Sequence, residues 1–84
     1  MTETKVGTVT HYYNHLHVAG VIMTHGELKP GDRIHIKGFT SDFEQDVGSM
    51  EMDHVPVTVA KPGDDIGLRV VAHAREHDTV FKVT

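Results

Sequence analysis

Histidine is the residue type with the richest chemistry in this chain of 84 residues, which holds eight histidines and no cysteine. Neutral imidazole is a common ligand of zinc and copper. Alternate residues of a strand share a face, so His15 and His17 can offer two imidazoles to one ion, and His35 on a neighbouring strand can offer a third. A small histidine-rich metal-binding protein is therefore one candidate function.

The same histidines also fit a solvated role on the surface. They alternate with apolar residues, as the outer face of a half-buried sheet does, and none stands in an H-E-x-x-H or similar ligand spacing. We therefore assign no metal site and no cofactor, and keep metal binding as the alternative function.

Other catalytic groups are sparse. The absence of cysteine removes thiolate nucleophiles, thiolate zinc sites and disulfides. Neither Ser41 nor Ser49 lies in a G-x-S-x-G elbow, and no G-x-x-x-x-G-K-[ST] loop is present to bind a nucleotide. An acid–base pair can be drawn only from a polar segment that is predicted to turn, without an enclosing pocket: His73, Glu76, His77 and Asp78. We predict no catalytic residue and no enzymatic activity.

Two adjacent tyrosines are the better binding candidates. Adjacent residues of a strand face opposite sides, so one of Tyr12 and Tyr13 fills the core while the other is exposed. An exposed tyrosine beside Asn14 and histidine can stack on a base or anchor a protein partner, although it can also simply pack against a neighbouring strand. The predicted binding residues are Tyr12, Tyr13, His15 and His17.

The elements that must carry these side chains are strands. Val, Ile and Thr together supply 25 of the 84 residues, whereas Leu and Ala supply only seven. Branched side chains pack well on a pleated surface and lose freedom in helices. The composition predicts an all-β domain spanning residues 1–84, which would have to close its own sheet edges without disulfides, as a small barrel does.

Alternation of apolar residues marks the strands. Residues 16–24 place Leu16, Val18 and Ile22 on the face opposite the outward His17, with Gly20 in phase with them. Residues 43–54 form a long extended segment with a β-bulge expected at Gly48. The remaining predicted strands are 5–13, 33–37, 55–59, 66–70 and 79–83.

Two Pro-Gly-Asp corners separate these strands. Glycine after proline supplies the positive φ of a type II turn, and the aspartate can accept hydrogen bonds from nearby backbone N–H groups. An anion-binding loop is the less favoured interpretation, because the aspartates add negative charge. The flanks of the two corners differ, so no repeat is predicted. We assign structural roles to Gly31, Asp32, Gly63 and Asp64, and to Gly67, where a strand lacking a side chain would admit close approach of another.

Three segments carry a family resemblance: VGTV (6–9), GELKPGDRIHIKG (26–38) and VGSMEMDHVPVTVAKPGDDIGLRV (47–70). In this order they resemble domain 2 of translation GTPases such as elongation factor Tu and initiation factor 2. TSDFEQDVGSME (40–51) is similar to small stand-alone translation elongation factor-like proteins, and a similar barrel ends some collagenase-like peptidases. The resemblance implies a small closed six-stranded antiparallel β-barrel.

The resemblance also implies a function. Domain 2 of elongation factor Tu helps hold the aminoacyl end of tRNA, but residues 10–17 here match no residues of that pocket, so the role is assigned to no position. We expect a non-catalytic module, without GTPase activity, that docks on a protein partner or an RNA end. The protein partner would belong to the translation machinery or be a collagenase-like peptidase.

Charge bears on the choice of partner. The formal net charge is −4 and the basic residues are scattered, so strong non-specific RNA binding is not expected at neutral pH. Protonation of all eight histidines would bring the charge to +4, so anion binding should strengthen below pH ~6.5. No apolar run is long enough for a membrane helix, and no leader is recognised at the start, so a cytoplasmic location is expected.

Overall fold

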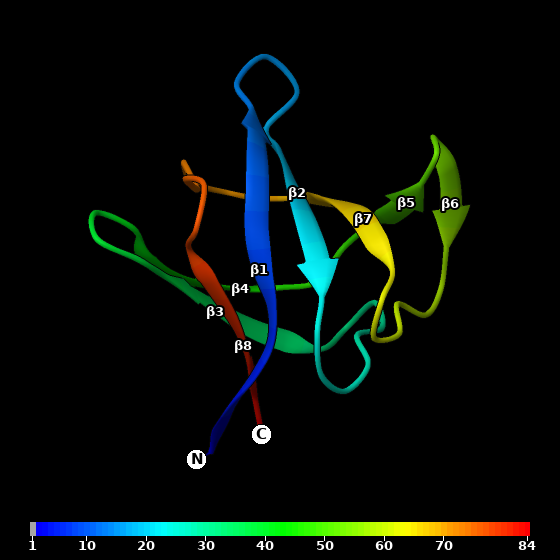
Figure 1. Ribbon diagram of the computed structural model, residues 1–84, viewed down its shortest axis with the longest axis horizontal. Coiled ribbons are helices and arrows are strands. Elements are labelled where there is room, and N and C mark those ends of the chain that lie inside the picture. Colours follow the sequence, from blue (N-terminus) through cyan, green and yellow to red (C-terminus); the bar gives the residue numbers. More distant parts are fainter. Residues whose placement is uncertain (1) are drawn as a thin grey trace.

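The computed structural model describes residues 2–84, and in that range it is an all-β protein built on one antiparallel sheet of eight strands (Figure 1). The strands are β1 (Glu3–Tyr13), β2 (Val18–Met23), β3 (Arg33–Lys37), β4 (Asp42–Asp46), β5 (Met50–Met52), β6 (Val55–Val57), β7 (Asp65–Arg69) and β8 (Thr79–Val83). Their order in the sheet is β4-β3-β8-β1-β2-β7-β5-β6. Residues 2–84 contain no helix with the length and apolar character that a membrane crossing requires.

The predicted closed barrel of six strands is wrong in strand number and in closure. The hydrogen-bonded ladder has eight strands and ends at β4 on one side and β6 on the other. The sheet nevertheless curls around a single core to which both of its halves contribute, including Ile34 and Ile36 of β3 and Met50 of β5. The fold is therefore barrel-like with an unpaired seam.

The side chain of Gln45 in β4 bridges that seam. Its Nε2 donates a hydrogen bond to the carbonyl oxygen of Arg69 at 2.8 Å, and the N–H of Val71 donates to its Oε1 at 2.8 Å. A buried amide that satisfies one backbone donor and one backbone acceptor can replace a rung of a missing ladder. This amide explains how edge strand β4 is held against the chain that follows β7.

The bulge expected at Gly48 is also wrong, because the strand is interrupted there. β4 ends at Asp46 and β5 begins at Met50. The backbone of Val47 is bonded elsewhere: it accepts from the N–H of Gly31 at 2.8 Å and donates to the carbonyl of Asp32 at 2.7 Å. Register shifts occur instead in β1, between Lys5 and Gly7 and between Val9 and His11.

The inward face of β2 is the opposite of the predicted one. Ala19, Val21 and Met23 are buried in the core, while Val18 and Ile22 lie on the outer face. Both faces of this segment are apolar, so its pattern does not determine which face turns inward. The pairing does: Val21 stands opposite Val9 of β1, whose side chain is also buried.

The two Pro-Gly corners have the backbone geometry of their sequence. Gly31 and Gly63 have φ values of 95° and 92°. The carboxylate of Asp32 accepts a hydrogen bond from the N–H of Lys29 at 2.9 Å, and Asp64 accepts from the N–H of Lys61 at 2.8 Å.

A third turn with the same geometry spans residues 75–78, although its sequence has neither proline nor glycine. Asp78 accepts a hydrogen bond from the N–H of Arg75 at 2.8 Å, and His77 takes the glycine position with a φ of 74°. In each turn, the N–H of the third residue and the carbonyl of the aspartate bond to one buried residue on another segment: Val47, Met23 and Val9 in order. The three turns are therefore copies of one structural unit. The differing sequence flanks do not reveal it, because the unit is held by backbone hydrogen bonds and one aspartate carboxylate.

Candidate functional site

A groove of about 700 Å³ on the outer face of the sheet is the main candidate site. The residues that line it belong to the β1–β2 hairpin, to β2 and β7, and to the segment from Ser49 through the β5–β6 turn. Figure 1 shows how these strands are arranged. Clefts of this size, with apolar walls and a few polar groups, are the usual form of binding sites.

Two glycines leave the floor of this groove without side chains. Gly20 of β2 and Gly67 of β7 are direct partners in the ladder. Their sequence neighbours Ala19 and Leu68 point into the core, so both glycines face outward. Gly20 is covered by Thr10, whose Oγ1 donates a hydrogen bond to the Gly20 carbonyl at 3.2 Å, so the missing side chain of Gly67 is the one that leaves the floor low.

Gly67 lies within strand β7, as the sequence predicts, and a Cβ placed there would meet its nearest atom, Cγ1 of Val18, at 3.4 Å. That distance is close to ordinary van der Waals contact, so no tight approach of another strand requires glycine at this position.

One wall of the groove is apolar. Tyr13 at the end of β1 is 47% exposed, and Leu16 in the following turn is 61% exposed. The N–H of Leu16 donates to the carbonyl of Tyr13 at 3.1 Å, which holds the two side chains on the same turn. Large apolar residues exposed side by side at a cleft are typical of an interaction surface.

The opposite wall and the ends of the groove are mostly acidic. Glu51, Asp53 and Asp65 line it with a single permanent cation, Arg69. Among residues 2–84, none of these four side chains forms an ion pair. Their charges are therefore available to a ligand.

The two predicted tyrosines lie on opposite sides of β1. The ring of Tyr12 packs against the core and stacks on the imidazole of His73, with centroids 4.3 Å apart and 23° between the planes. Tyr13 is exposed and meets the imidazole of His11 edge-on, at 4.5 Å. Only Tyr13 lines the groove, while Tyr12 borders a shallower hollow beside His73 and Glu76.

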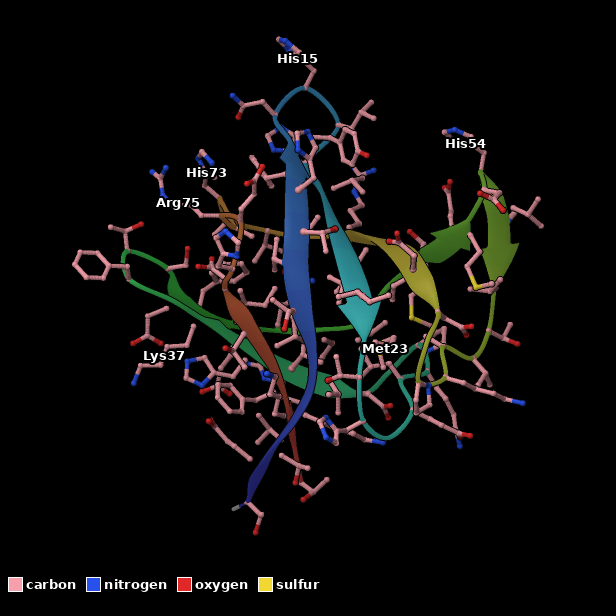
Figure 2. All side chains as sticks on the ribbon, viewed as in Figure 1. His15, Met23, Lys37, His54, His73 and Arg75 are labelled. Carbon is pink, nitrogen blue, oxygen red and sulfur yellow. The ribbon has the colours of Figure 1, made fainter. Side chains whose placement is uncertain are left out.

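The histidines proposed as a metal triad do not come together. Residues 14–17 form a turn and not a strand, so His15 and His17 do not share a strand face; His15 stands at the tip of the β1–β2 hairpin (Figure 2). His35 lies on β3, where its Nδ1 contacts Glu3 Oε2 at 2.8 Å and its Nε2 contacts Asp42 Oδ1. Within residues 2–84, the alternative metal site of His15, His17 and His35 is therefore not formed.

The surroundings of His35 explain its ionisation. Its hydrogen bond to Asp42 and that to Glu3 raise its pKa above 6.5, against an opposing effect of burial. The same bond lowers the pKa of Asp42. Glu3, His35 and Glu44 have potential ligand atoms within 4.8 Å of one another, but Glu44 already pairs with Arg33 at 3.4 Å and both imidazole nitrogens have partners. The cluster is thus explained by ion pairing.

The polar segment 73–78, the candidate for an acid–base pair, makes structural contacts instead. His77 and Asp78 form the third turn, Asp78 being only 3% exposed. Glu76 lies 3.6 Å from Nδ1 of His11, and His73 stacks on Tyr12.

Sequence reasoning missed most of the groove. Leu16, Glu51 and Arg69 belong to three separate segments, and only the ladder brings them to one surface. The available signal was Gly20, which breaks a branched apolar strand at a position in phase with Val18 and Ile22.

Comparisons with known proteins agree with this architecture. The sequence model of the family described as elongation factor Tu domain 2 matches residues 17–80. An uncharacterized protease of Methanocaldococcus jannaschii is 36% identical over 78 residues, which are 92% of this chain and 19% of that protein. Elongation factor 1-alpha of Thermoplasma acidophilum is 47% identical over 45 residues, which are 54% of this chain and 10% of the factor.

A solved structure gives the same fold. The C-terminal domain of a protein assigned as a U32 peptidase, from Geobacillus thermoleovorans, superposes with a TM-score of 0.87 over 94% of this chain and 91% of that domain, at 18% identity. The chain thus covers most of that solved domain, whereas it spans a fifth or less of the length of the curated relatives.

Proposed function

The chain belongs to the elongation factor Tu domain 2 family, as its sequence resemblance predicts, and on that premise we propose that it is a non-catalytic docking module whose outer groove binds a protein partner. The proposal includes the absence of GTPase activity and a cytoplasmic location. It rests on the groove between the β1–β2 and β5–β6 hairpins, where a glycine floor, exposed Tyr13 and Leu16, and unpaired charges meet.

The form of the groove favours docking over catalysis. It is open to solvent along the outer face of a rigid sheet, and the residues lining it include no histidine–serine or histidine–carboxylate pair in hydrogen-bond contact within residues 2–84. Such a pair is the usual means of activating a nucleophile or orienting a catalytic base.

The relatives suggest the kind of partner. One is named as an elongation factor and another as an uncharacterized protease, and in both this type of domain is a small part of a longer chain. We propose that this chain docks on a component of the translation machinery or on a peptidase. RNA is the less favoured partner, because the groove has three carboxylates and one guanidinium, whereas phosphate binding relies on clustered lysine and arginine.

Site-specific photo-crosslinking tests this proposal. A photoreactive amino acid replaces Leu16 in the groove or, as a control, the fully exposed Phe39 at the β3–β4 turn. In an extract of the cells that express the protein, we expect a defined protein adduct from position 16 that survives ribonuclease and is absent from position 39. An adduct lost after ribonuclease, or the same adducts from both positions, would contradict the proposal.

A further inference from the structure

We propose that the occupant of the groove is a cationic protein segment: an extended stretch of the partner with lysine or arginine next to an apolar residue. This inference rests on the proposed docking function and specifies the chemistry of its partner.

The charges of the groove are arranged for such a segment. Glu51 stands opposite Gly67 in the ladder, directly beside the floor. Asp65 begins β7 at one end of the floor, and Asp53 lies in the β5–β6 turn. These three carboxylates are exposed and lack ion-pair partners within residues 2–84, so a ligand cation would not have to displace an existing pair. Complementary charge of this kind directs association and fixes orientation.

The shape of the floor fits the side chains that carry positive charge. Lysine and arginine have long apolar stems that lie along apolar surface while their charged heads remain at the edge. Thr10 covers Gly20, with its Oγ1 bonded to the Gly20 carbonyl at 3.2 Å, so the shallow channel lies over Gly67, between Val18 and the carboxylates. A stem can lie in this channel with its head at Glu51 or Asp65.

The apolar wall of the groove is the reason to expect an apolar residue next to the cation in the partner segment. Tyr13 and Leu16 are exposed on the hairpin at the other side of the floor, so an apolar side chain adjacent to the cation would cover them. Buried aromatic contacts of this type contribute strongly to binding at protein interfaces.

Arg69 provides an internal test, because it is the one guanidinium among the groove residues. It repels a cationic ligand and attracts a phosphate. Replacing it should therefore change the affinity for peptide and for RNA in opposite directions.

The experiment is an NMR titration of the full chain labelled with nitrogen-15. The probes are a short peptide with leucine between two arginines, the matched peptide with glutamates for arginines, and a single-stranded oligouridine. We expect the arginine peptide to shift the amide signals of Gly20, Gly67 and Leu16, and to bind at least about tenfold more tightly than the glutamate peptide, with an affinity that falls as salt is added.

Variants assign the effect to the groove. The double variant Glu51→Gln and Asp65→Asn should weaken binding of the arginine peptide about tenfold, and Arg69→Gln should strengthen it. Glu27→Gln, which removes an exposed carboxylate outside the groove, should leave it unchanged. Thermal unfolding of each variant verifies that the fold is retained.

Equal binding of both peptides, weaker binding of the arginine peptide by the Arg69→Gln variant, or oligouridine that binds more tightly than the arginine peptide would overturn the inference. If the cross-linking at position 16 yields a protein adduct but the arginine peptide does not bind, the inferred cationic chemistry of the partner is wrong, while the proposed docking function is retained. If position 16 yields no specific adduct either, the proposed function fails as well.

Discussion

Gln45 and Arg69 are joined across the open seam of the sheet, side-chain Nε2 to backbone oxygen, at 2.8 Å. The same amide accepts the N–H of Val71, so one side chain replaces the paired hydrogen bonds that a closing strand would supply. Gln45 is 7% exposed, and no buried side-chain nitrogen or oxygen in residues 2–84 lacks a partner. The curled shape of this family member therefore depends on a polar contact as well as on its core.

Gln45→Ala should lower the free energy of unfolding by about 2 kcal/mol, because it leaves one backbone donor and one acceptor unpaired in a shielded place. Urea denaturation followed by circular dichroism measures this change. Thr40→Ala, an exposed position in the β3–β4 turn, is the control and should have little effect. Equal stability of the two variants would show that the seam does not depend on Gln45.

Gly63→Ala should destabilise the fold by about 1 kcal/mol, because a φ of 92° is unfavourable for any residue with a Cβ. No atom lies within 4 Å of the place where the new Cβ would sit, so the effect comes from the backbone alone. Gly48→Ala is the matched control: it also has open space but no positive φ, and should be neutral or slightly stabilising. Thermal unfolding of both variants measures the difference, and the same loss in both would contradict the turn geometry.

The hydrogen bonds of His35 make stability depend on pH. Because the folded-state pKa of His35 is raised, its contribution is full below its unfolded pKa of 6.5 and is lost as pH rises through the higher folded value. The pKa of Asp42 is lowered, so its contribution is full above its unfolded value of 3.8 and is lost as pH falls through the lower folded value. Both contributions are present together between these two unfolded values.

His35→Gln should therefore reduce the free energy of unfolding more at pH about 5 than at pH about 9. Urea denaturation at both pH values measures the two differences. His25→Gln, at an exposed position on the loop after β2, is the control for replacing a histidine and should show a much smaller pH effect. A loss of stability that is the same at both pH values would exclude the protonated pair.

The predictions from sequence succeeded where local chemistry decides the structure. The segments 33–37 and 79–83 have the predicted strand bounds, and in 33–37 the alternation of apolar and polar residues allows only one inward face. Residues 16–23 are apolar on both faces, so their orientation depended on pairing with β1, which no local pattern reveals. The seam is similar: nothing in the sequence around Gln45 indicates that its amide will meet the end of β7.

At the candidate site, too, the sequence predicted what local chemistry decides and missed what depends on strand pairing. Tyr13 was found because an exposed aromatic residue is informative by itself. The floor of the groove was not found, because Gly20 and Gly67 stand opposite each other in strands that are far apart in sequence. The alternative metal site of His15, His17 and His35 is not formed, because His15 and His17 lie in a turn, where the two-residue period of strands does not apply.

Gly67→Val should separate docking from stability, since it places a branched side chain on the groove floor. Valine is a good strand residue, and the nearest atom to a Cβ here is 3.4 Å away on a side chain, so the free energy of unfolding should change by no more than about 1 kcal/mol. The new methyl groups would occupy the channel between Val18 and Glu51, so adduct formation from position 16 and binding of the arginine peptide should both fall at least about tenfold. Val71→Ala changes an exposed apolar residue outside the groove and should alter neither. Undiminished binding by a folded Gly67→Val protein would show that the partner does not use this floor.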